Sequence, residues 1–192
     1  MIAYKGFKGN LTCTLGNGVF QYEPGQTITE ESSKCARRGM HCTEYPLECF
    51  TWYPPCKGNR YFEVEAGGSI DECEGDAKIA CTQMTLLREL SVFQVAAKGM
   101  VYMVEHPQRE WEISGGNFAA EKDKAEALKE GAVAIARGRQ PQVRGVSGAV
   151  LGLVKENAKG MIVDAKVFVV RDKIKPGTWY TIRNRILREV EQ

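Results

Sequence analysis

The sequence predicts an α+β fold, in which a small mixed α/β N-terminal unit precedes a small antiparallel β unit. Two patterns lead to this prediction. Helix start and stop signals alternate with short strand patterns in the first half of the chain, whereas alternating patterns typical of strands predominate after residue 132. The length of 192 residues suits one medium domain or two small ones, and a hydrophobic fraction of 43% is sufficient for a core.

The charged segment "FAAEKDKAEALKEG" marks the expected division of the chain. Its composition is typical of a surface helix that ends at Gly131. We therefore expect an N-terminal α+β domain over residues 1–105, a charged helical connector over 106–131 and a C-terminal β-rich unit over 132–192. No internal repeat with a period of 20–50 residues is evident.

Short strands and two helices are expected in the first third of the chain. "MIAYKGF", "VFQY" and "MHCT" are typical of strands. "TITEESSKCARRGMH" predicts a helix, because Thr29 is a suitable N-cap and Gly39 a suitable stop. A second short helix should begin near Pro46 and end before Pro54, since proline is tolerated only in the first turn.

The next segments predict two strands and a longer helix. "RYFEVEA" alternates in polarity and "KIACT" resembles a further strand. The capping box of Ser91 and Gln94 then predicts a helix that runs to about Glu105. In the alternating strand, the side chains expected to face inward are Phe62, Val64 and Ala66.

After residue 132 the patterns are those of strands. They are "AVAIARG", "GAVLGLVKE", "MIVDAKVFVV", "GTWYTIR" and "ILREVE". "RNR" between the last two predicts a hairpin turn. A two-stranded hairpin is marginal alone, so its apolar side chains should dock on a sheet or on a second copy of the chain.

The composition limits the partners. The net charge of +2 argues neither for nor against nucleic acid, and nucleic acid is not an expected partner. No apolar run approaches the roughly 18 residues that a membrane span needs, and the N-terminus lacks the apolar stretch of a signal peptide. We therefore expect a cytoplasmic protein of the host cell, with no membrane partner and no cofactor.

The seven cysteines all precede residue 82, and four of them lie seven residues apart at positions 35, 42, 49 and 56. Zinc sites usually contain C-x(2–4)-C pairs, which this spacing lacks. Without a signal peptide, reduced thiols are expected. We interpret the spacing as coincidence and expect neither a metal site nor a disulfide.

No catalytic residue is predicted. A cysteine nucleophile needs a base, but His41 and Cys42 are adjacent on a predicted strand and therefore point to opposite faces. The other histidine, His106, precedes a proline at a predicted helix end.

A small ligand would bind where "AYKGF" meets "GMHCTEYPLECFTWY". A cation, an imidazole and aromatic rings together suit a phosphate-bearing aromatic ligand. The alternative is that the two tyrosines fill the core, the lysine is solvated and the histidine bonds a carbonyl. The candidate ligand-binding residues are Tyr4, Lys5, His41, Trp52 and Tyr53.

A second candidate surface is "ARGRQPQVRG". Its three cations, Arg137, Arg139 and Arg144, could contact an anion or an acidic partner. The alternative is a solvated loop without a function.

Several motifs resemble an uncharacterised protein family of tailed phages and prophages. They are "YKGF", "FQYEPGQT", "GMHCTEYPLECFTWYPP", "YFEVEAGGSID", "DAKIACTQMTL" and the closing "KIKPGTWYTIRNRILREVE". The resemblance covers about residues 1–90 and 143–192. Longer members carry short "G-D-A-x-A" β repeats in the middle, where this sequence predicts one charged helix and one strand. The resemblance implies an origin rather than a reaction.

A weaker similarity concerns ADP-ribosyltransferases. They begin with a strand carrying Arg or His beside Gly, and continue with a strand, a helix bearing Tyr, and a "VEV" strand. "AYKGF", "GMHCTEYPLECFTWY" and "RYFEVEA" follow this order, with Lys5 in the first position. A lysine provides neither a planar fork nor an imidazole, so the similarity implies a nucleotide-binding fold more than an active transferase.

These observations predict a binding protein. We expect a phage or prophage accessory factor, of anti-defence type, that engages a host protein or sequesters a nucleotide-like signal without turnover. One alternative is an ADP-ribosyltransferase-like enzyme that uses Lys5, His41 and Tyr53. The other is a structural or assembly protein, for which the C-terminal β unit would form a homo-oligomer.

Overall fold

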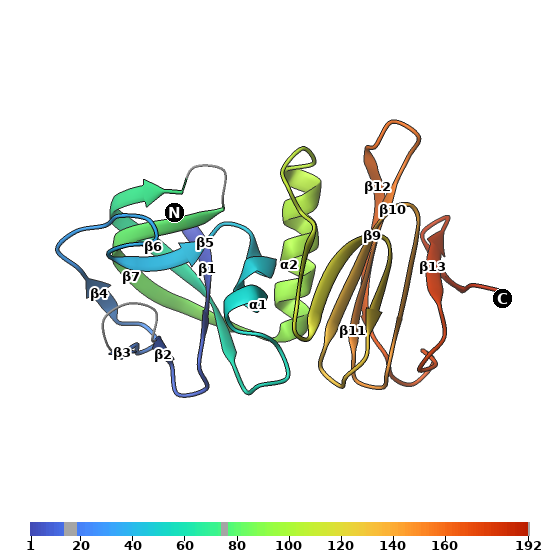
Figure 1. Ribbon diagram of the computed structural model, residues 1–192, viewed down its shortest axis with the longest axis horizontal. Helices are drawn as coiled ribbons and strands as arrows, with labels where there is room; N and C mark the ends of the chain where they lie inside the picture. The colour runs from blue at the N-terminus through green and yellow to red at the C-terminus, as the bar shows by residue number, and fades with distance from the viewer. Residues whose placement is uncertain (14–18, 74–76, 192) are drawn as a thin grey trace. The chain divides into compact units, whose positions relative to one another are not determined.

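The protein is mainly β. The computed structural model describes residues 1–13, 19–73 and 77–191, with 51% of the chain in strands and 11% in helices. The predicted α+β class is therefore wrong. The chain forms two compact units, one from Met1–Tyr53 with Lys57–Ser91 and the other from Pro54–Cys56 with Val92–Gln192 (Figure 1). Among the described helices, none has both the length and the apolar character that a membrane crossing requires.

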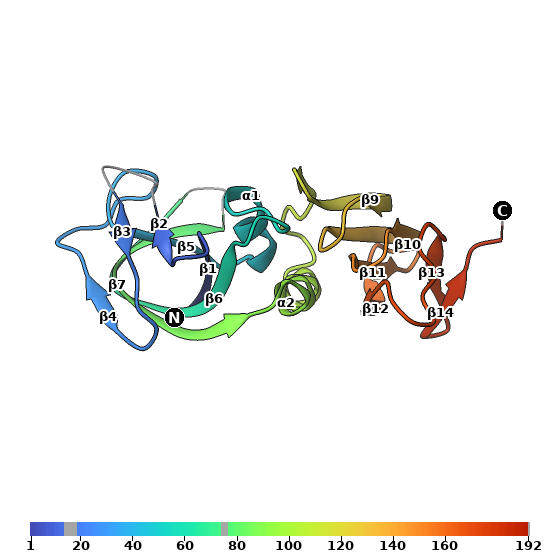
Figure 2. The ribbon, with the colours of Figure 1, turned by 90° about the horizontal axis from the view of Figure 1, so that it is seen from below.

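Four antiparallel strands of the first unit close into a ring. They are β1 (Ile2–Phe7), β5 (Met40–Thr43), β6 (Arg60–Glu72) and β7 (Lys78–Leu90). β1 pairs with β5 and β6, and β7 pairs with the same two strands. Register shifts along the β6–β7 pair allow these long strands to bend. Figure 2 shows the four strands around a common interior.

The interior of this ring is filled by alternate side chains of each strand. Phe7 of β1 makes edge-to-face contacts with Phe62 of β6 and with Tyr22. The predicted inward set of β6 is confirmed, because Phe62, Val64 and Ala66 are all buried.

Short elements flank the ring of strands. η1 (Pro46–Glu48) and α1 (Cys49–Trp52) form the short helix predicted after Pro46. They lie on the outside of β1, where Gly6 leaves room for the ring of Tyr53. The remaining strands of the unit are β2 (Thr12–Cys13), β3 (Phe20–Gln21) and β4 (Thr27–Thr29).

The helix predicted from "TITEESSKCARRGMH" is wrong. Its first residues form β4, which pairs with β7. The backbone N–H of Glu30 then donates to the carbonyl of Thr82, so the strand pairing takes the hydrogen-bonding groups that a helix would have used. Gly39 does not stop a helix. It adopts a φ of +82°, and a Cβ there would lie 2.9 Å from the carbonyl oxygen of Cys81.

The second unit contains three parallel strands that are joined by very short connections. They are β9 (Phe118–Ala127), β10 (Val133–Gly145) and β11 (Val150–Glu156) (Figure 1). Parallel neighbours normally need a crossover of a dozen or more residues. Here residues 128–132 and 146–149 suffice, because β9 and β10 bend and their second halves return across the unit.

Two features show where these strands bend. β9 bends at Asp123, which has a φ of 63°, and the β9–β10 register shifts between Arg137 and Gln142. Within β10, β13 (Tyr180–Arg183) pairs with the second half alone, through Val143 and Tyr180. The unit is therefore a short solenoid with two layers of strands. The first layer contains the first halves of β9 and β10 beside β11, and the second layer contains their second halves beside β13.

The core between the two layers is rich in alanine. Small side chains fit because the backbone segments approach closely, and a Cβ on Gly145 would lie 3.0 Å from Cβ of Ala149. The buried cluster consists of Ala125, Ala127, Ala132, Ala134, Ala136, Val143, Ala149, Leu151, Leu153, Val170, Tyr180 and Ile182.

A glycine with positive φ begins each coil of the solenoid. The three coils start at "GNFA", "GAVA" and "GAVL", where Gly116, Gly131 and Gly148 have φ of 57°, 74° and 79°. Backbone hydrogen bonds connect equivalent positions, since Val133 N–H donates to Asn117 and Val150 N–H donates to Ala132. The three glycines are 15 and then 17 residues apart. This spacing is shorter than the period of 20–50 residues for which the sequence shows no repeat.

The remaining elements complete both layers. α2 (Val92–Glu105) packs outside the first layer, where a Cβ on Gly152 would lie 2.8 Å from Sδ of Met100. β8 (Ile113–Gly115) and β12 (Ile162–Val169) pair with β9 and β11. β14 (Ile186–Glu189) pairs with β13 through a turn in which Asn184 and Arg185 have φ of 51° and 62°, which confirms the predicted "RNR" hairpin.

The predicted charged helix within residues 106–131 is also wrong, because that segment contains β8 and β9. Ala125 and Ala127 face the core and the intervening charged residues face outward. Pairing with β10, which lies later in the chain, overrides the helix propensity of Ala, Glu and Lys.

Candidate functional site

His41 lies at the centre of a surface on the outside of the first unit. Its Nε2 accepts a hydrogen bond of 3.0 Å from the backbone N–H of Ala36. Burial lowers the pKa of His41, and the positive charges of Lys5 and Lys78 lower it further. The imidazole is therefore neutral at neutral pH, and the lone pair of Nε2 is already engaged.

An exposed aromatic ring with a cation over it lies on the same side of the sheet as His41, since Lys78 pairs in register with Thr43. The ammonium of Lys78, the first residue of β7, lies 4.3 Å from the ring centroid of Trp52. Trp52 is the last residue of α1 and is 50% exposed. A ring that is half open to solvent and held beside a cation can stack on a planar anionic ligand.

A disulfide attaches the loop of residues 34–38 beside the same surface. Cys35 is bonded to Cys73, so the expectation that all cysteines are reduced is wrong for these two. The backbone N–H of Cys35 donates to Oδ2 of Asp71 at 2.6 Å, and its Sγ lies 3.8 Å from the carbonyl oxygen of Lys78.

The loop of residues 34–38 carries two exposed arginines. Arg37 and Arg38 form no ion pair with any residue that the structure describes. We call Trp52, Lys78, His41 and the loop of residues 34–38 the His41 surface. Its charged groups other than the Lys34–Asp71 pair are cationic.

Lys5 lies inside the ring of strands and not on this surface. Its Nζ donates to the carbonyl oxygen of His41 at 2.5 Å and lies 5.5 and 5.4 Å from the ring centroids of Phe7 and Tyr22. Only 9% of the residue is exposed. Neither the predicted ligand contact nor the alternative of a solvated lysine matches this placement.

The two tyrosines of the predicted site occupy different environments. Tyr53 is buried against Gly6, and its carbonyl accepts a hydrogen bond of 2.6 Å from the hydroxyl of Tyr61. Tyr4 is half-buried on β1, opposite Thr43 of β5. This register places Tyr4 on the same side of the sheet as His41 and Lys78. Of the five predicted residues, the structure therefore brings Tyr4, His41 and Trp52 to one side of the sheet, where Lys78 contacts Trp52.

Sequence reasoning missed Lys78 and the loop of residues 34–38. Lys78 begins the strand predicted at "KIACT", but only the position of α1 shows that its ammonium meets Trp52. The spacing of Cys35 and Cys73 resembles no motif. The seven-residue cysteine spacing corresponds to no common role, because Cys35 is in a disulfide, Cys42 and Cys49 are buried and Cys56 is exposed.

The buried thiols are poor nucleophiles. The pKa of Cys42 is raised by its hydrogen bond with Cys81 and by burial, and burial raises the pKa of Cys49 to about 12. A protonated thiol without solvent access does not react as a thiolate. Among the residues that the structure describes, no three His, Cys, Asp or Glu side chains are placed to hold a metal ion.

The three arginines of the second candidate surface occupy different environments. Arg137 is 3% exposed on β10, where it pairs with Glu156 and stacks on Trp111. Arg139 is exposed where β10 bends, and Arg144 pairs with Glu126. The segment is thus part of a strand rather than one solvated loop.

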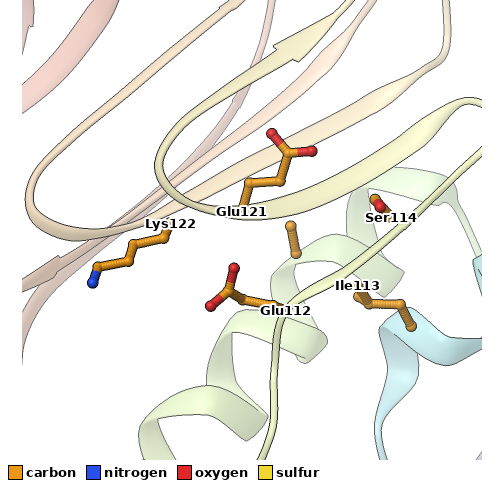
Figure 3. Close-up of a pocket in the computed structure, with 6 residues that line it drawn as sticks. Glu112, Ile113, Ser114, Glu121 and Lys122 are labelled. Carbon is orange, nitrogen blue, oxygen red and sulfur yellow. The ribbon is translucent and has the colours of Figure 1, made fainter.

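An open groove of about 410 Å³ lies beside β8 in the second unit. Figure 3 shows the side chains of Glu112 and Glu121 extending in different directions, with Lys122 to one side. Two carboxylates and one ammonium at an open groove favour no single class of ligand. Its lining residues are Glu112, Ile113, Ser114, Ala120, Glu121 and Lys122.

Comparison with known proteins identifies the first unit. Residues 1–98 match the model of a domain of unknown function, DUF7666. The chain belongs to this family. The match covers the whole ring of strands and the first half of α2, so the His41 surface lies within the DUF7666 domain. No curated protein and no solved structure gives a significant match.

Proposed function

We propose that the DUF7666 unit is a binding module without turnover and that it recognises a nucleotide-like anion at the His41 surface. The observation that carries this proposal is the ammonium of Lys78 lying 4.3 Å from the half-exposed ring of Trp52. A planar base would stack on the open part of the ring, and stacking on an aromatic side chain contributes about 1–3 kcal/mol.

The cations around Trp52 account for the anionic part of the ligand. Lys78 would contact a phosphate next to the stacked base. The guanidinium groups of Arg37 and Arg38 are exposed and could bind phosphate oxygens in the bidentate manner that arginine favours. The disulfide and the contact of Ala36 with His41 fix the loop that presents them.

Binding without turnover is supported by the groups that a reaction would need. Nε2 of His41 accepts the N–H of Ala36, so this nitrogen is not available as a base. Lys5, the residue an ADP-ribosyltransferase-like reaction would use, is inside the ring of strands and bonds the His41 carbonyl. We therefore favour a binding module over an ADP-ribosyltransferase-like enzyme and over a purely structural protein.

The resemblance to tailed-phage and prophage proteins leads us to propose the biological setting. The protein would be an accessory factor of anti-defence type that sequesters a nucleotide-like signal of the host or engages a host protein through the same surface. Because it would not turn the signal over, the amount of signal removed would be proportional to the amount of protein present.

Thermal melting with a panel of mono-, di- and cyclic nucleotides tests the proposal, with native mass spectrometry of the protein from phage-infected host cells as a second readout. We expect at least one nucleotide to raise the melting temperature of the wild type, and Trp52→Ala and Lys78→Met to abolish the shift. Lys8→Gln, which removes an exposed lysine of the same unit, should leave it unchanged. No shift with any nucleotide and no co-purifying ligand would refute the site, and transfer of label from NAD to protein would refute binding without turnover.

A further inference from the structure

The outer face of the second strand layer of the solenoid carries a row of basic side chains around Trp179. Tyr180 and Ile182 of β13 belong to the buried core, so Trp179 and Arg183 point to the other side. Thr181 lies on that side too but is buried, and its hydroxyl donates to the carbonyl oxygen of Pro141. The register places Arg188 of β14 opposite Thr181. We call the outward side chains of Lys124, Glu126, Arg144, Trp179, Arg183 and Arg188 the Trp179 face.

Side chains from β9 and β10 meet the ring of Trp179, which immediately precedes β13. The Cζ of Arg144, on β10, lies 4.8 Å from the ring centroid, and the Nζ of Lys124, on β9, lies 5.3 Å from it. Arg144 also pairs with Glu126 at 2.9 Å. These contacts hold the indole against the sheet with cations beside it, in the arrangement that a stacking surface requires.

The charge of this face is unbalanced. Four of its side chains are cations, and Glu126, its only carboxylate among the described residues, is already paired with Arg144. Arg183 and Arg188 are exposed, and neither forms an ion pair within the described part of the chain. Lys124 likewise forms none there. The nearby carboxylate of Glu189 belongs to the opposite side of β14, since Glu189 pairs in register with Tyr180, and it bonds Lys175.

We propose that the Trp179 face binds single-stranded nucleic acid. Its unpaired cations complement a phosphate backbone, and an aromatic side chain among cations on an open sheet suits stacking of an unpaired base. The face is a sheet, without a helix that could enter the major groove of a duplex. The low net charge of +2 for the whole chain does not oppose this inference, because Glu126 is the only acidic group that the described residues place on this face.

Fluorescence anisotropy with labelled single strands of about 15 nucleotides, a length near the upper site size of single-strand binders, tests the inference. DNA and RNA strands are compared with a duplex of equal length and with poly-glutamate. We expect single strands to bind at about 50 mM salt and to weaken steeply as salt rises, because phosphate contacts release counterions. The duplex and poly-glutamate should bind at least tenfold more weakly.

Charge-reversal variants assign the binding to the face. Arg183→Glu with Arg188→Glu should weaken binding at least tenfold and reduce the slope of log K against log salt by about 1.4, or about 0.7 for each lost phosphate contact. Lys159→Glu with Lys166→Glu changes the net charge equally at exposed positions outside this face and should change the affinity less than twofold. Far-UV circular dichroism verifies that both pairs remain folded.

Two single variants separate stacking and the DUF7666 site from this surface. Trp179→Leu should weaken binding by roughly 5- to 150-fold, the range that one stacked base contributes, whereas Trp179→Phe should retain most of it. Trp52→Ala should leave it unchanged, so this inference and the proposed function fail independently. Three results would overturn the inference: no binding at low salt, equal binding of duplex or poly-glutamate, or equal losses in the two charge-reversal pairs.

Discussion

Replacing Arg137 by methionine should destabilise the second unit by about 2–3 kcal/mol. Nε of Arg137 donates to Oε1 of Glu156 at 2.7 Å, and its Nη2 donates to the carbonyl oxygen of Pro107 at 3.1 Å. The guanidinium lies 5.0 Å from the ring centroid of Trp111. One side chain therefore connects β10, β11 and the segment that follows α2.

The magnitude follows from burial. Removing one partner of a fully buried ion pair costs about 3–5 kcal/mol because the other charge stays buried. Here the side chain of Arg137 is 4% exposed but that of Glu156 is 20% exposed, so water can solvate part of the remaining carboxylate. Nη1 of Arg137 has no hydrogen-bond partner among the described residues, which lowers the stabilisation that the native arginine provides. For both reasons, we expect Arg137→Met to lower the free energy of unfolding by less than the loss of a partner from a fully buried ion pair would.

Urea unfolding followed by tryptophan fluorescence measures the change, since Trp111 contacts the guanidinium. Adding Glu156→Gln to Arg137→Met should recover about 1 kcal/mol or more, because the uncompensated carboxylate is removed. A cost below about 0.5 kcal/mol for Arg137→Met, the range of ordinary surface substitutions, would contradict the reasoning. So would an additive effect of the two substitutions.

Two further predictions concern the His41 surface. Cys35→Ser should lower the free energy of unfolding by up to about 4 kcal/mol, the loop-closure value for a sequence separation of 38 residues. The free energies of unfolding of oxidised and reduced wild type, measured with urea, should differ by the same amount, and equal midpoints would contradict this. The folded pKa of His41 lies below its ordinary 6.5, so the unfolded chain binds more protons and the contribution of His41 is complete above pH 6.5 and decreases as the pH falls below it. His41→Gln should therefore flatten the fall in urea midpoint between about pH 7.5 and 5.5, and an unchanged slope would count against the shift.

Local patterns were sufficient where the deciding contacts are local. The alternation in "RYFEVEA" predicts β6 and its buried side correctly, and the capping box at Ser91 predicts α2 to within a residue. The turn in "RNR" is likewise decided by the residues that form it. In each case, burial of one face or satisfaction of a few backbone groups depends on neighbours in the sequence.

Patterns failed where a distant strand supplies the hydrogen bonds. Residues 27–29 and 118–127 both carry helix signals, yet β7 and β10 pair with them. A single sequence gives no sign of these partners, because propensity differences of a few tenths of a kcal/mol per residue are smaller than the burial gained by joining a sheet. The glycines that begin the three coils were a usable signal, but their spacing lies below the range of common repeats.

The sequence predicted which types of residue form the candidate site, but not which individual residues lie on it. His41 and Trp52 were expected to meet a ligand, and they do share a surface. Lys5 occupies the interior instead, and Lys78 is the cation beside Trp52. Adjacent strand positions point to opposite sides. Which side becomes the interior depends on closure of the ring by β6 and β7, and this closure is not encoded near Lys5.

The alternation of inward and outward side chains also explains why the sequence alone did not predict the Trp179 face. In β9, Ala125 and Ala127 enter the core while Lys124 and Glu126 face outward. The segment thus reads as a charged helix with alanine, although it is a strand with a narrow apolar side. Once β10 and β13 align beside it, Arg144 and Trp179 join Lys124 on one face. An alanine-rich core and a basic outer face are therefore two consequences of one strand pattern, and a substitution that enlarges an inner alanine should disturb the basic face as well as the core.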